Sequence, residues 1–428
     1  MSTHDHHKNG VNGNGVDGNG VHALTPGLEP LEVDELFDGA RFVLIGGTGF
    51  LGKIFWLMLL DRFPQIGKIY LLCRSSKSQT SEERFWGTIV HSEAMAPLRE
   101  KYGDGLDAFL REKIVPVDGD IGKVSCGIHE PLLHELRGTI DALVNVAGVV
   151  DFNPPLDEAL HANAFGAQNL VSLAHSLGDV PLYHTSTCYV AGKRRGPINE
   201  INPNESPFPR CEELGRELWD PDREIAECLD LIAQAKSRAD DAFRQSEFEE
   251  RAKKNLAKKN EPVHGDAFEQ EFKKEKRKFV SDKLIEAGLD RAVHWGWPNI
   301  YTYTKSIGEQ VIAKSGLAFT IARPACCEST DVFPMVGWNE GINTSAPLMY
   351  LMMQGLVQIP ARHVPLDFIQ TDMVTAGMIL ALAELLEGTA KPVYQFGASD
   401  VNPATAARFG QFEPPAPAPS WYSECPRV

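Results

Sequence analysis

A tyrosine and a lysine four positions apart, Tyr301 and Lys305, have a spacing that could support catalysis. The i to i+4 spacing places both side chains on one face of a helix. An ammonium group beside a phenol favours the phenolate, so we expect Lys305 to lower the pKa of Tyr301 towards neutrality. A phenol tuned in this way suits general acid–base chemistry. Chance occurrence on an ordinary helix is the alternative, because the pattern is short.

A cluster of hydroxyl side chains, Thr185-Ser186-Thr187, follows a short apolar run. In α/β proteins, ligands bind beyond the carboxyl ends of the strands, where this cluster would lie. Together with the glycine and tyrosine–lysine motifs, this position favours a place for the cluster in a catalytic site. The alternative is that these hydroxyls only cap backbone groups.

Three glycines spaced by three, Gly46, Gly49 and Gly52, lie between an apolar run and a helical pattern. This G-x-x-G-x-x-G pattern lets the backbone turn tightly and brings a pyrophosphate to the helix N-terminus. A glycine turn without a ligand is the alternative. The dinucleotide contacts that we predict in this segment are Gly46, Thr48, Gly49, Phe50, Leu51 and Gly52.

The second apolar run ends at Arg74, where an acidic residue would bind the ribose hydroxyls of NAD. An arginine there can bind the 2′-phosphate instead, which favours NADPH. Asp120 follows the third run and could accept a hydrogen bond from the adenine amine or cap a helix. We also predict cofactor contacts at Ile121 and Ala147. At the nicotinamide end, the predicted contacts are Tyr301 and Lys305, the latter binding the ribose hydroxyls.

Short apolar runs alternate with helical patterns around these motifs. The expected strands are Arg41–Gly46, Lys68–Cys73, Lys113–Val117, Asp141–Val146, Pro181–Thr185 and Ala318–Arg323. This alternation predicts the α/β class, with a Rossmann-type, doubly wound parallel sheet, a charged helical insertion and a smaller substrate-binding region. The predicted segments are a Gly/Asn-rich disordered tail (1–37), the NADP-binding domain (38–210), the insertion (211–296), the completion of the Rossmann domain with the substrate region (297–408) and a proline-rich tail (409–428).

The insertion is the most highly charged part of the chain, with 21 acidic and 17 basic residues between Cys211 and Trp295. Apolar residues at helical spacing, among them Ile225, Leu229 and Phe243, predict helices with one face on the body. The basic runs Arg251–Lys259 and Lys273–Lys278 predict either a solvated face or a peripheral contact with an anionic ligand or membrane.

The formal net charge of −16 over 428 residues argues against nucleic-acid binding, which needs basic surface. The eight cysteines include no C-x-x-C pair, so we expect neither a disulfide framework nor a metal site, and favour a reducing, cytoplasmic setting. The longest apolar stretch, Met373–Leu386, is about half the length of a membrane span.

Taken together, these motifs resemble the extended short-chain dehydrogenase/reductase superfamily, and several stretches resemble its fatty acyl-CoA reductases. The similarity covers about 41–205 and 297–408. It is carried by G-F-L-G-K (49–53), I-Y-L-L-C-R (69–74), T-S-T-C-Y-V (185–190), W-P-N-I-Y-T-Y-T-K (297–305), A-R-P (322–324), G-W (337–338) and F-I-Q-T-D-M-V (368–374).

The resemblance implies NADPH-dependent reduction of long-chain fatty acyl-CoA to aldehyde, alcohol or both. Thr187, Ser186 and Tyr301 would stabilise the oxyanion, and Tyr301 would protonate the aldehyde, with Lys305 tuning its pKa. The apolar region Pro347–Ile359 would contribute to the acyl tunnel. The alternatives are an extended reductase or epimerase acting on a nucleotide sugar or another carbonyl compound, and a non-catalytic NADP-binding protein.

Three features depart from the family pattern. Ile45 stands where a threonine usually precedes the first glycine, and Cys188 replaces an alanine. The C-terminal reductase region is not recognisable, and the match gives way near Phe409 to proline-rich sequence. We therefore expect a truncated or frameshifted form of a longer parent, with a tail outside the core.

Overall fold

The computed structural model describes residues 30–405, except 77, 149, 342–344, 346, 348–349, 352–353, 355 and 357–364. The elements below belong to the compact unit that begins at Val33. Its first helix, α1 (Val33–Phe37), corrects the expected tail over 1–37, because Phe37 is fully buried against Phe42 and Phe63. The region Pro347–Ile359 and the tail 409–428 lie largely or entirely outside the described residues.

The centre of the molecule is a seven-stranded parallel sheet of order β10-β6-β5-β4-β1-β2-β3. The strand order reverses between β1 and β4, and in such sheets this reversal marks the ligand-binding crevice. The expected Rossmann-type sheet is therefore confirmed. The strands are β1 (Arg41–Ile45), β2 (Lys68–Cys73), β3 (Ile114–Asp118), β4 (Ala142–Asn145), β5 (Leu182–Thr185), β6 (Phe319–Pro324) and β10 (Val393–Phe396).

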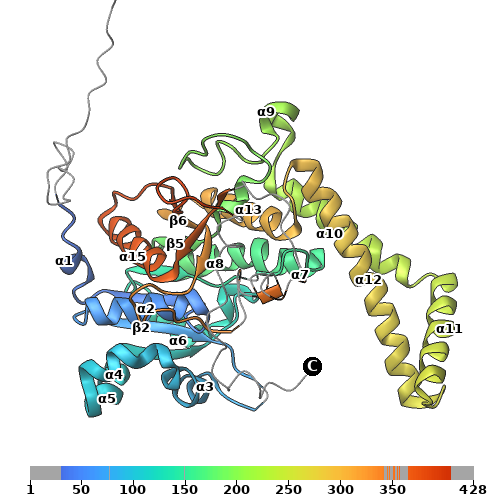
Figure 1. Cartoon of the computed structure of the whole chain (residues 1–428), viewed down its shortest axis with the longest axis horizontal. Helices are drawn as coiled ribbons and strands as arrows, with labels where there is room; N and C mark the ends of the chain where they lie inside the picture. The colour runs from blue at the N-terminus through green and yellow to red at the C-terminus, as the bar shows by residue number, and fades with distance from the viewer. Residues whose placement is uncertain are drawn as a thin grey trace, which may run out of the picture. The chain divides into compact units, whose positions relative to one another are not determined.

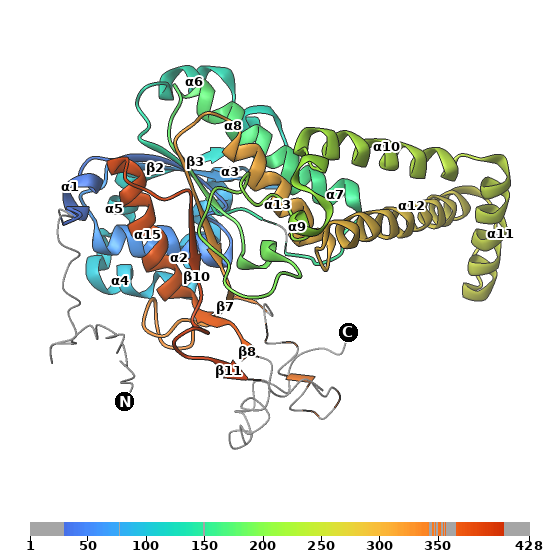
Figure 2. The same cartoon turned by 90° about the horizontal axis from the view of Figure 1, so that it is seen from above.

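Helices cover both faces of the sheet (Figure 2). On one face α6, α8 and α13 bury a core that includes Val43, Leu143 and Leu182. On the other face, α2 packs against α15 and stacks Phe55 on Tyr183. The helices of this body are α2 (Phe50–Arg62), α3 (Ser81–Gly87), α4 (Ala96–Tyr102), α5 (Leu106–Lys113), α6 (Glu130–Leu136), α7 (Leu156–Leu160), a π-helical turn (His161–Phe165), α8 (Gly166–Ser176), α13 (Ile300–Ala313) and α15 (Thr371–Glu387).

The insertion forms the short helix α9 (Cys211–Leu214) and three long helices, α10 (Pro221–Ala239), α11 (Ala242–Lys259) and α12 (Gly265–Trp295). In the described structure, α10 and α12 pack on α7 and α13, whereas α11 packs against α12 and α10 and lies away from the sheet (Figures 1 and 2). Ile225 is buried as expected, but Leu229 is exposed because the packed face of α10 follows Ile225, Cys228, Ile232, Ala235 and Ala239. Phe243 is also exposed, because the packed face of α11 follows Phe248, Ala252 and Leu256.

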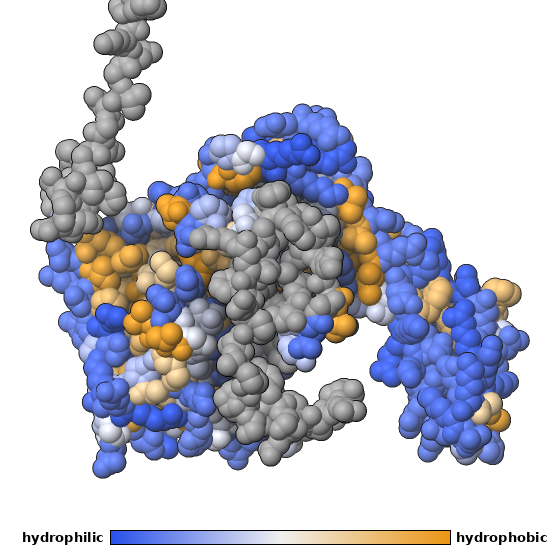
Figure 3. Space-filling view, in the orientation of Figure 1, coloured by the Kyte–Doolittle hydropathy of each residue, from blue (hydrophilic) through white to orange (hydrophobic). Residues whose placement is uncertain are grey.

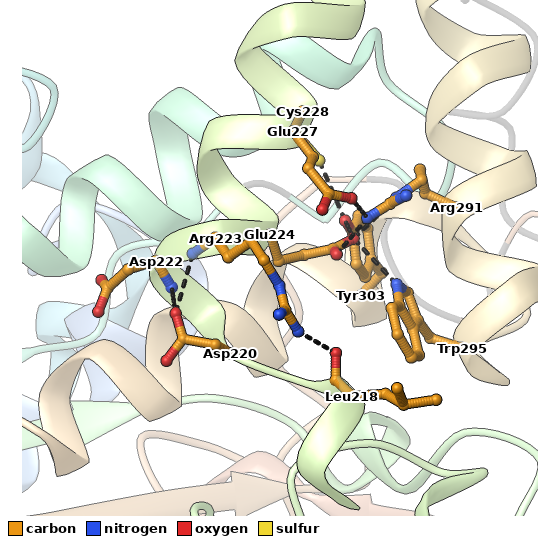
Figure 4. Close-up of polar contacts among 10 residues, drawn as sticks. All are labelled: Leu218, Asp220, Asp222, Arg223, Glu224, Glu227, Cys228, Arg291, Trp295 and Tyr303. Carbon is orange, nitrogen blue, oxygen red and sulfur yellow. Dashed lines mark hydrogen bonds and ion pairs between the residues drawn. The ribbon is translucent and has the colours of Figure 1, made fainter. Parts of the chain in front are cut away.

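A buried polar network fastens the insertion to the body (Figure 4). Glu224 of α10 is only 3 % exposed, and its carboxylate accepts hydrogen bonds from Tyr303 of α13 and from Trp295 Nε1 at 3.0 Å. Arg291 of α12 donates to the same carboxylate from Nε at 2.9 Å. A buried carboxylate needs such partners, so this cluster fixes where α10 and α12 meet α13.

The described part of the smaller region contains two short sheets. β7 (Cys326–Glu328) pairs with β9 (Phe368–Gln370), and β8 (Pro365–Leu366) pairs with β11 (Ala404–Thr405). Asp372, at the start of α15, accepts hydrogen bonds from the backbone N–H groups of Asp331, Val332 and Phe333. This carboxylate therefore holds the loop after β7 against α15.

Candidate functional site

The glycine turn between β1 and α2 is sterically tight on two sides. Gly46 has φ +87°, and a Cβ there would lie 2.3 Å from the Ala147 backbone nitrogen. A Cβ at Gly52 would lie 2.2 Å from the Gly46 carbonyl oxygen. A Cβ at Gly49 would make only ordinary contact, at 3.5 Å from the same oxygen. The open side of the turn is therefore at Gly49, where the unpaired N–H groups of the first turn of α2 can meet an anion.

A cleft at the carboxyl ends of the strands brings together six of the twelve predicted dinucleotide contacts. It is lined by Ile45, Gly46, Thr48, Leu72, Arg74, Arg84, Gly119, Asp120, Ile121, Ala147, Gly148 and Ala162. Gly49, Phe50, Leu51 and Gly52 do not line it. The Phe50 ring instead stacks on Trp338 at 5.2 Å, and Gly52 allows α2 to pack on the turn.

Two arginines line one end of this cleft. Arg74 follows β2, and Arg84 of α3 donates from Nη1 to the Arg74 carbonyl oxygen at 3.1 Å. Thr80 and Glu83 form a capping box that fixes the start of α3. Sequence reasoning did not single out Arg84, because an arginine on a surface helix carries no distinguishing pattern. Two arginines that line the same cleft make a site suited to a phosphate.

Asp120 also lines the cleft, but its carboxylate is partly engaged by the chain. Its Oδ1 accepts a hydrogen bond from Gly122 N at 3.0 Å, which is a turn contact rather than a helix cap. The neighbouring Asp118 accepts from Ser75 N at 3.0 Å and holds the segment after β2. Asp120 keeps acceptor capacity for a ligand, since an ionised carboxylate has two oxygens.

At the other end, helix α13 and the end of β5 bring the four predicted catalytic residues close together. Tyr301, Lys305, Ser186 and Thr187 are all at least nine-tenths buried. Asn299 caps α13 by accepting from Thr302 N at 2.9 Å. Thr187 lies beside the Tyr301 side chain and donates from Oγ1 to the Pro324 carbonyl oxygen at 3.4 Å. Lys305 Nζ donates to the Thr185 carbonyl oxygen at 3.0 Å.

The close approach of α13 to the helices beside it holds this arrangement in place. Asn163, in the π-helical turn, donates from Nδ2 to Thr304 Oγ1 at 2.9 Å. A Cβ at Gly308 would lie 2.7 Å from the Asn163 carbonyl oxygen, so glycine is required at this crossing. Phe152 accepts a backbone hydrogen bond from Tyr301 N at 3.1 Å, and their rings meet edge to face.

The electrostatics differ from the sequence expectation for Tyr301. Burial raises the Tyr301 pKa to about 12, nearby Cys327 adds to the increase, and the hydrogen bond with Thr187 partly opposes it. Burial lowers the pKa of Lys305 to about 8, although Glu309 opposes this change. The expected shift of Tyr301 towards neutrality is thus wrong for the protein alone, because desolvation of the phenolate outweighs any help from Lys305.

The residues at this end fit a nicotinamide nucleotide. Within the described chain, the buried hydroxyls of Thr185 and Ser186 have no hydrogen-bond partner. Gly148 lines the cleft, and a Cβ there would lie 3.0 Å from Lys305 Nζ. The cleft therefore continues along the backbone of Gly148 to Lys305, where no side chain would block the ribose of a dinucleotide and polar groups could bind its hydroxyls.

Comparison with known families agrees with this geometry. The family model described as male sterility protein, an NAD-binding domain, matches residues 44–378. The chain belongs to this family. The NAD-binding domain of this family and its reductase relatives support an NAD(P)-dependent oxidoreductase.

Relatives of this male sterility family member include several plant proteins. The chain is 32% identical over 372 residues to the probable fatty acyl-CoA reductase 5 of Arabidopsis thaliana, covering 85% of this chain and 67% of that protein. It is 29% identical over 377 residues to the alcohol-forming fatty acyl-CoA reductase of Simmondsia chinensis, and the match covers 86% of this chain and 69% of that protein. Among solved structures, the terminal R domain of the myxalamid PKS-NRPS pathway superposes with a TM-score of 0.51 at 21% identity. The superposition covers 86% of this chain and 66% of that one.

Proposed function

We propose that this protein uses NADPH to reduce long-chain fatty acyl-CoA thioesters to aldehyde, alcohol or both. The observation that carries the proposal is the buried cluster of Tyr301, Thr187 and Lys305, which adjoins the dinucleotide cleft at Gly148. Membership of a family whose relatives are named fatty acyl-CoA reductases supports the choice of substrate.

The choice of NADPH over NADH rests on Arg74 and Arg84. Two arginines that line the cleft after β2 attract a 2′-phosphate, and Arg74 stands at the position where an acidic residue would bind the ribose hydroxyls of NAD. When bound, the nicotinamide supplies the hydride. The protein binds and orients the cofactor and the substrate, and it sets the electrostatic environment of the reacting carbonyl.

Thr187 and Tyr301 would act on the substrate oxygen. Addition of hydride to the thioester carbonyl places negative charge on that oxygen, and hydroxyl donors at this point stabilise it. The resulting tetrahedral thiohemiacetal collapses with loss of the CoA thiolate and leaves the aldehyde. With a pKa near 12, the Tyr301 phenol is protonated throughout the neutral range, so it can donate a proton to the aldehyde oxygen in a second reduction.

Apolar side chains beside these donors support an acyl substrate. Phe152 contacts Tyr301 and is 63% exposed, and Tyr189, two residues after Thr187, is 48% exposed. Exposed rings next to a buried polar site offer contact area to a hydrocarbon chain. Sequence reasoning missed Phe152, because it lies in a loop without periodicity.

Product analysis tests the proposal. The purified chain is incubated with NADPH and a mixture of saturated acyl-CoAs, and aldehydes, alcohols and released CoA are quantified. We expect chain-length-dependent products with one equivalent of NADPH consumed per aldehyde and two per alcohol. Intact acyl-CoA together with conversion of a nucleotide sugar would favour the epimerase alternative. Tight NADPH binding without turnover of either substrate would favour a non-catalytic NADP-binding protein.

A further inference from the structure

The hairpin formed by α11 and the first half of α12 differs in charge from the rest of the protein. Residues 251–278 carry ten basic and five acidic side chains, although the whole chain has a formal net charge of −16. Both cartoon views show this hairpin lying away from the sheet, and its visible surface is mostly hydrophilic with a few apolar patches (Figures 1–3). The positive charge of the molecule is therefore concentrated on one projecting element.

The two helices pack through a defined inner side. On α11 this side contains Phe248, Ala252 and Leu256, which are buried. The Phe248 ring meets Phe272 and Phe279 of α12 at 6.3 and 5.4 Å. These aromatic rings are used inside the hairpin, so its outer surface is built mainly from charged side chains.

One outer face of the hairpin carries basic side chains that have no acidic partner. Arg251, Lys254 and Lys258 are spaced i, i+3 and i+7, so they form a stripe along α11. In the described structure neither these three residues nor Arg277 and Lys278 of α12 make an ion pair, and all five are exposed. We call these five residues the unpaired face.

Helix geometry places the α11 stripe and Lys278 of α12 on the same side of the hairpin. Arg251 directly precedes the inner residue Ala252, and Lys278 directly precedes the inner residue Phe279. On each helix, the residue just before an inner position points about 100° away from it around the helix axis. Because the two right-handed helices run antiparallel, this rotation brings the preceding residue of either helix to the same face of the hairpin. Arg251, Lys254, Lys258 and Lys278 therefore place four unneutralised charges on one surface, next to Lys274, which pairs with Glu271 at 3.9 Å.

The opposite face has similar basic residues, but they are neutralised. Lys253 pairs with Glu249 at 4.0 Å, Lys273 pairs with Glu269 at 3.7 Å, and Lys276 pairs with Asp240. We call Lys253, Lys273 and Lys276 the paired face. The contrast between the two faces argues against a generally solvated, charge-balanced helix pair.

We propose that the unpaired face binds the anionic surface of a lipid membrane. α11 has 18 residues and is about 27 Å long, so its stripe presents a row of charges rather than a pocket. Such a row fits a continuous anionic surface, to which each basic side chain adds about fivefold in affinity. The acidic remainder of the chain is repelled by the same surface, which would make the hairpin the point of contact.

Vesicle sedimentation tests this proposal without substrate or cofactor, so its outcome is independent of the proposed reductase activity. The full chain is mixed with phosphatidylcholine vesicles containing about 30% phosphatidylserine, or none. The test variant is Arg251→Gln/Lys254→Gln/Lys258→Gln. The matched control is Lys253→Gln/Lys273→Gln/Lys276→Gln, which changes the net charge equally on the paired face. Circular dichroism and melting temperature establish that each variant is folded.

We expect the wild-type chain to bind the anionic vesicles and to lose binding as salt is raised, because the interaction is electrostatic. The test variant should bind about a hundredfold more weakly, whereas the control should stay within a few-fold of wild type. Equal binding to neutral vesicles, or equal losses in the two variants, would overturn the proposal. Absence of wild-type binding to vesicles, with retention on immobilised polyglutamate, would also overturn it and assign the face to an acidic protein.

Discussion

Helix α13 carries two buried tyrosines, Tyr301 and Tyr303, in two contrasting surroundings. The Tyr303 hydroxyl donates to Glu224 and lies 3.1 Å from Cys228 Sγ, both on the inserted helix α10. The Tyr301 side chain lies beside Thr187, on the same face of the helix as Lys305. Two positions along a helix turn a side chain by about 200°, so one tyrosine faces the insertion and the other faces the site.

The comparison shows that burial alone does not mark a catalytic tyrosine. Burial is the largest cause of a raised pKa for both phenols. The Tyr303 hydroxyl already donates its hydrogen bond to the Glu224 carboxylate, so this tyrosine stabilises the fold. Tyr301 adjoins unpartnered hydroxyls and an exposed aromatic ring, and so it can serve a ligand.

Replacing Tyr301 is expected to have the largest effect. Tyr301→Phe should lower the rate of acyl-CoA reduction by roughly 10²–10⁴, because a general acid and an oxyanion donor are lost together. NADPH binding, measured by fluorescence titration, should stay within a few-fold of wild type. Near wild-type turnover would remove Tyr301 from the mechanism.

The arginines test which end of the cleft binds the 2′-phosphate. Arg74→Ala should weaken NADPH binding about ten- to a hundredfold while changing NADH binding little, because only NADPH offers the charge-assisted contact. Arg84→Ala should act in the same direction. Calorimetric titration with both cofactors measures the difference. Equal weakening for NADPH and NADH would show that the arginines support the fold instead.

Replacing Tyr303 should produce the opposite phenotype to replacing Tyr301. Tyr303→Phe removes a donor from the buried Glu224 carboxylate and should lower the free energy of unfolding by about 1–3 kcal/mol. The reaction rate per folded molecule should remain near wild type. Urea denaturation measures the free energy of unfolding, and steady-state kinetics measures the reaction rate per folded molecule. A large rate loss with unchanged stability would mean that the roles of the two tyrosines have been exchanged.

The smallest predicted effect concerns pH. Lys305 has a pKa lowered to about 8, so its charged form is present below that pH and is lost as the pH rises through it. If the ammonium group binds the nicotinamide ribose, NADPH affinity should fall about fivefold between pH 7 and pH 9.5. Lys305→Arg keeps its charge in this range and should flatten the profile. A flat wild-type profile would contradict a binding role for the charge.

The sequence predicted the central strands well because buried parallel strands are continuous apolar runs. β2 has the expected bounds, and β1 differs by one residue at its end. The edge strand β10 was missed, since Val393–Phe396 is short and only its first residue is buried. The spacing also found Tyr301 and Lys305, which share one helix face by local geometry.

Other parts of the site depend on contacts that no local pattern encodes. Arg84 reaches Arg74 only because α3 folds back on the end of β2. Tyr303 and Glu224 are 79 residues apart and meet only when the insertion docks. The pKa direction of Tyr301 was wrong because burial, which decides it, is a property of the assembled helices.

The central claim is that the Tyr301 side of α13 directs reduction of an acyl thioester and the Tyr303 side does not. The most direct measurement follows NADPH absorbance with palmitoyl-CoA for wild type, Tyr301→Phe and Tyr303→Phe at matched folded concentrations. We expect NADPH oxidation with release of CoA for wild type and Tyr303→Phe, and at least a hundredfold slower oxidation for Tyr301→Phe. Absence of palmitoyl-CoA-dependent oxidation by the folded, NADPH-binding wild-type chain, or equal rates in all three proteins, would contradict it.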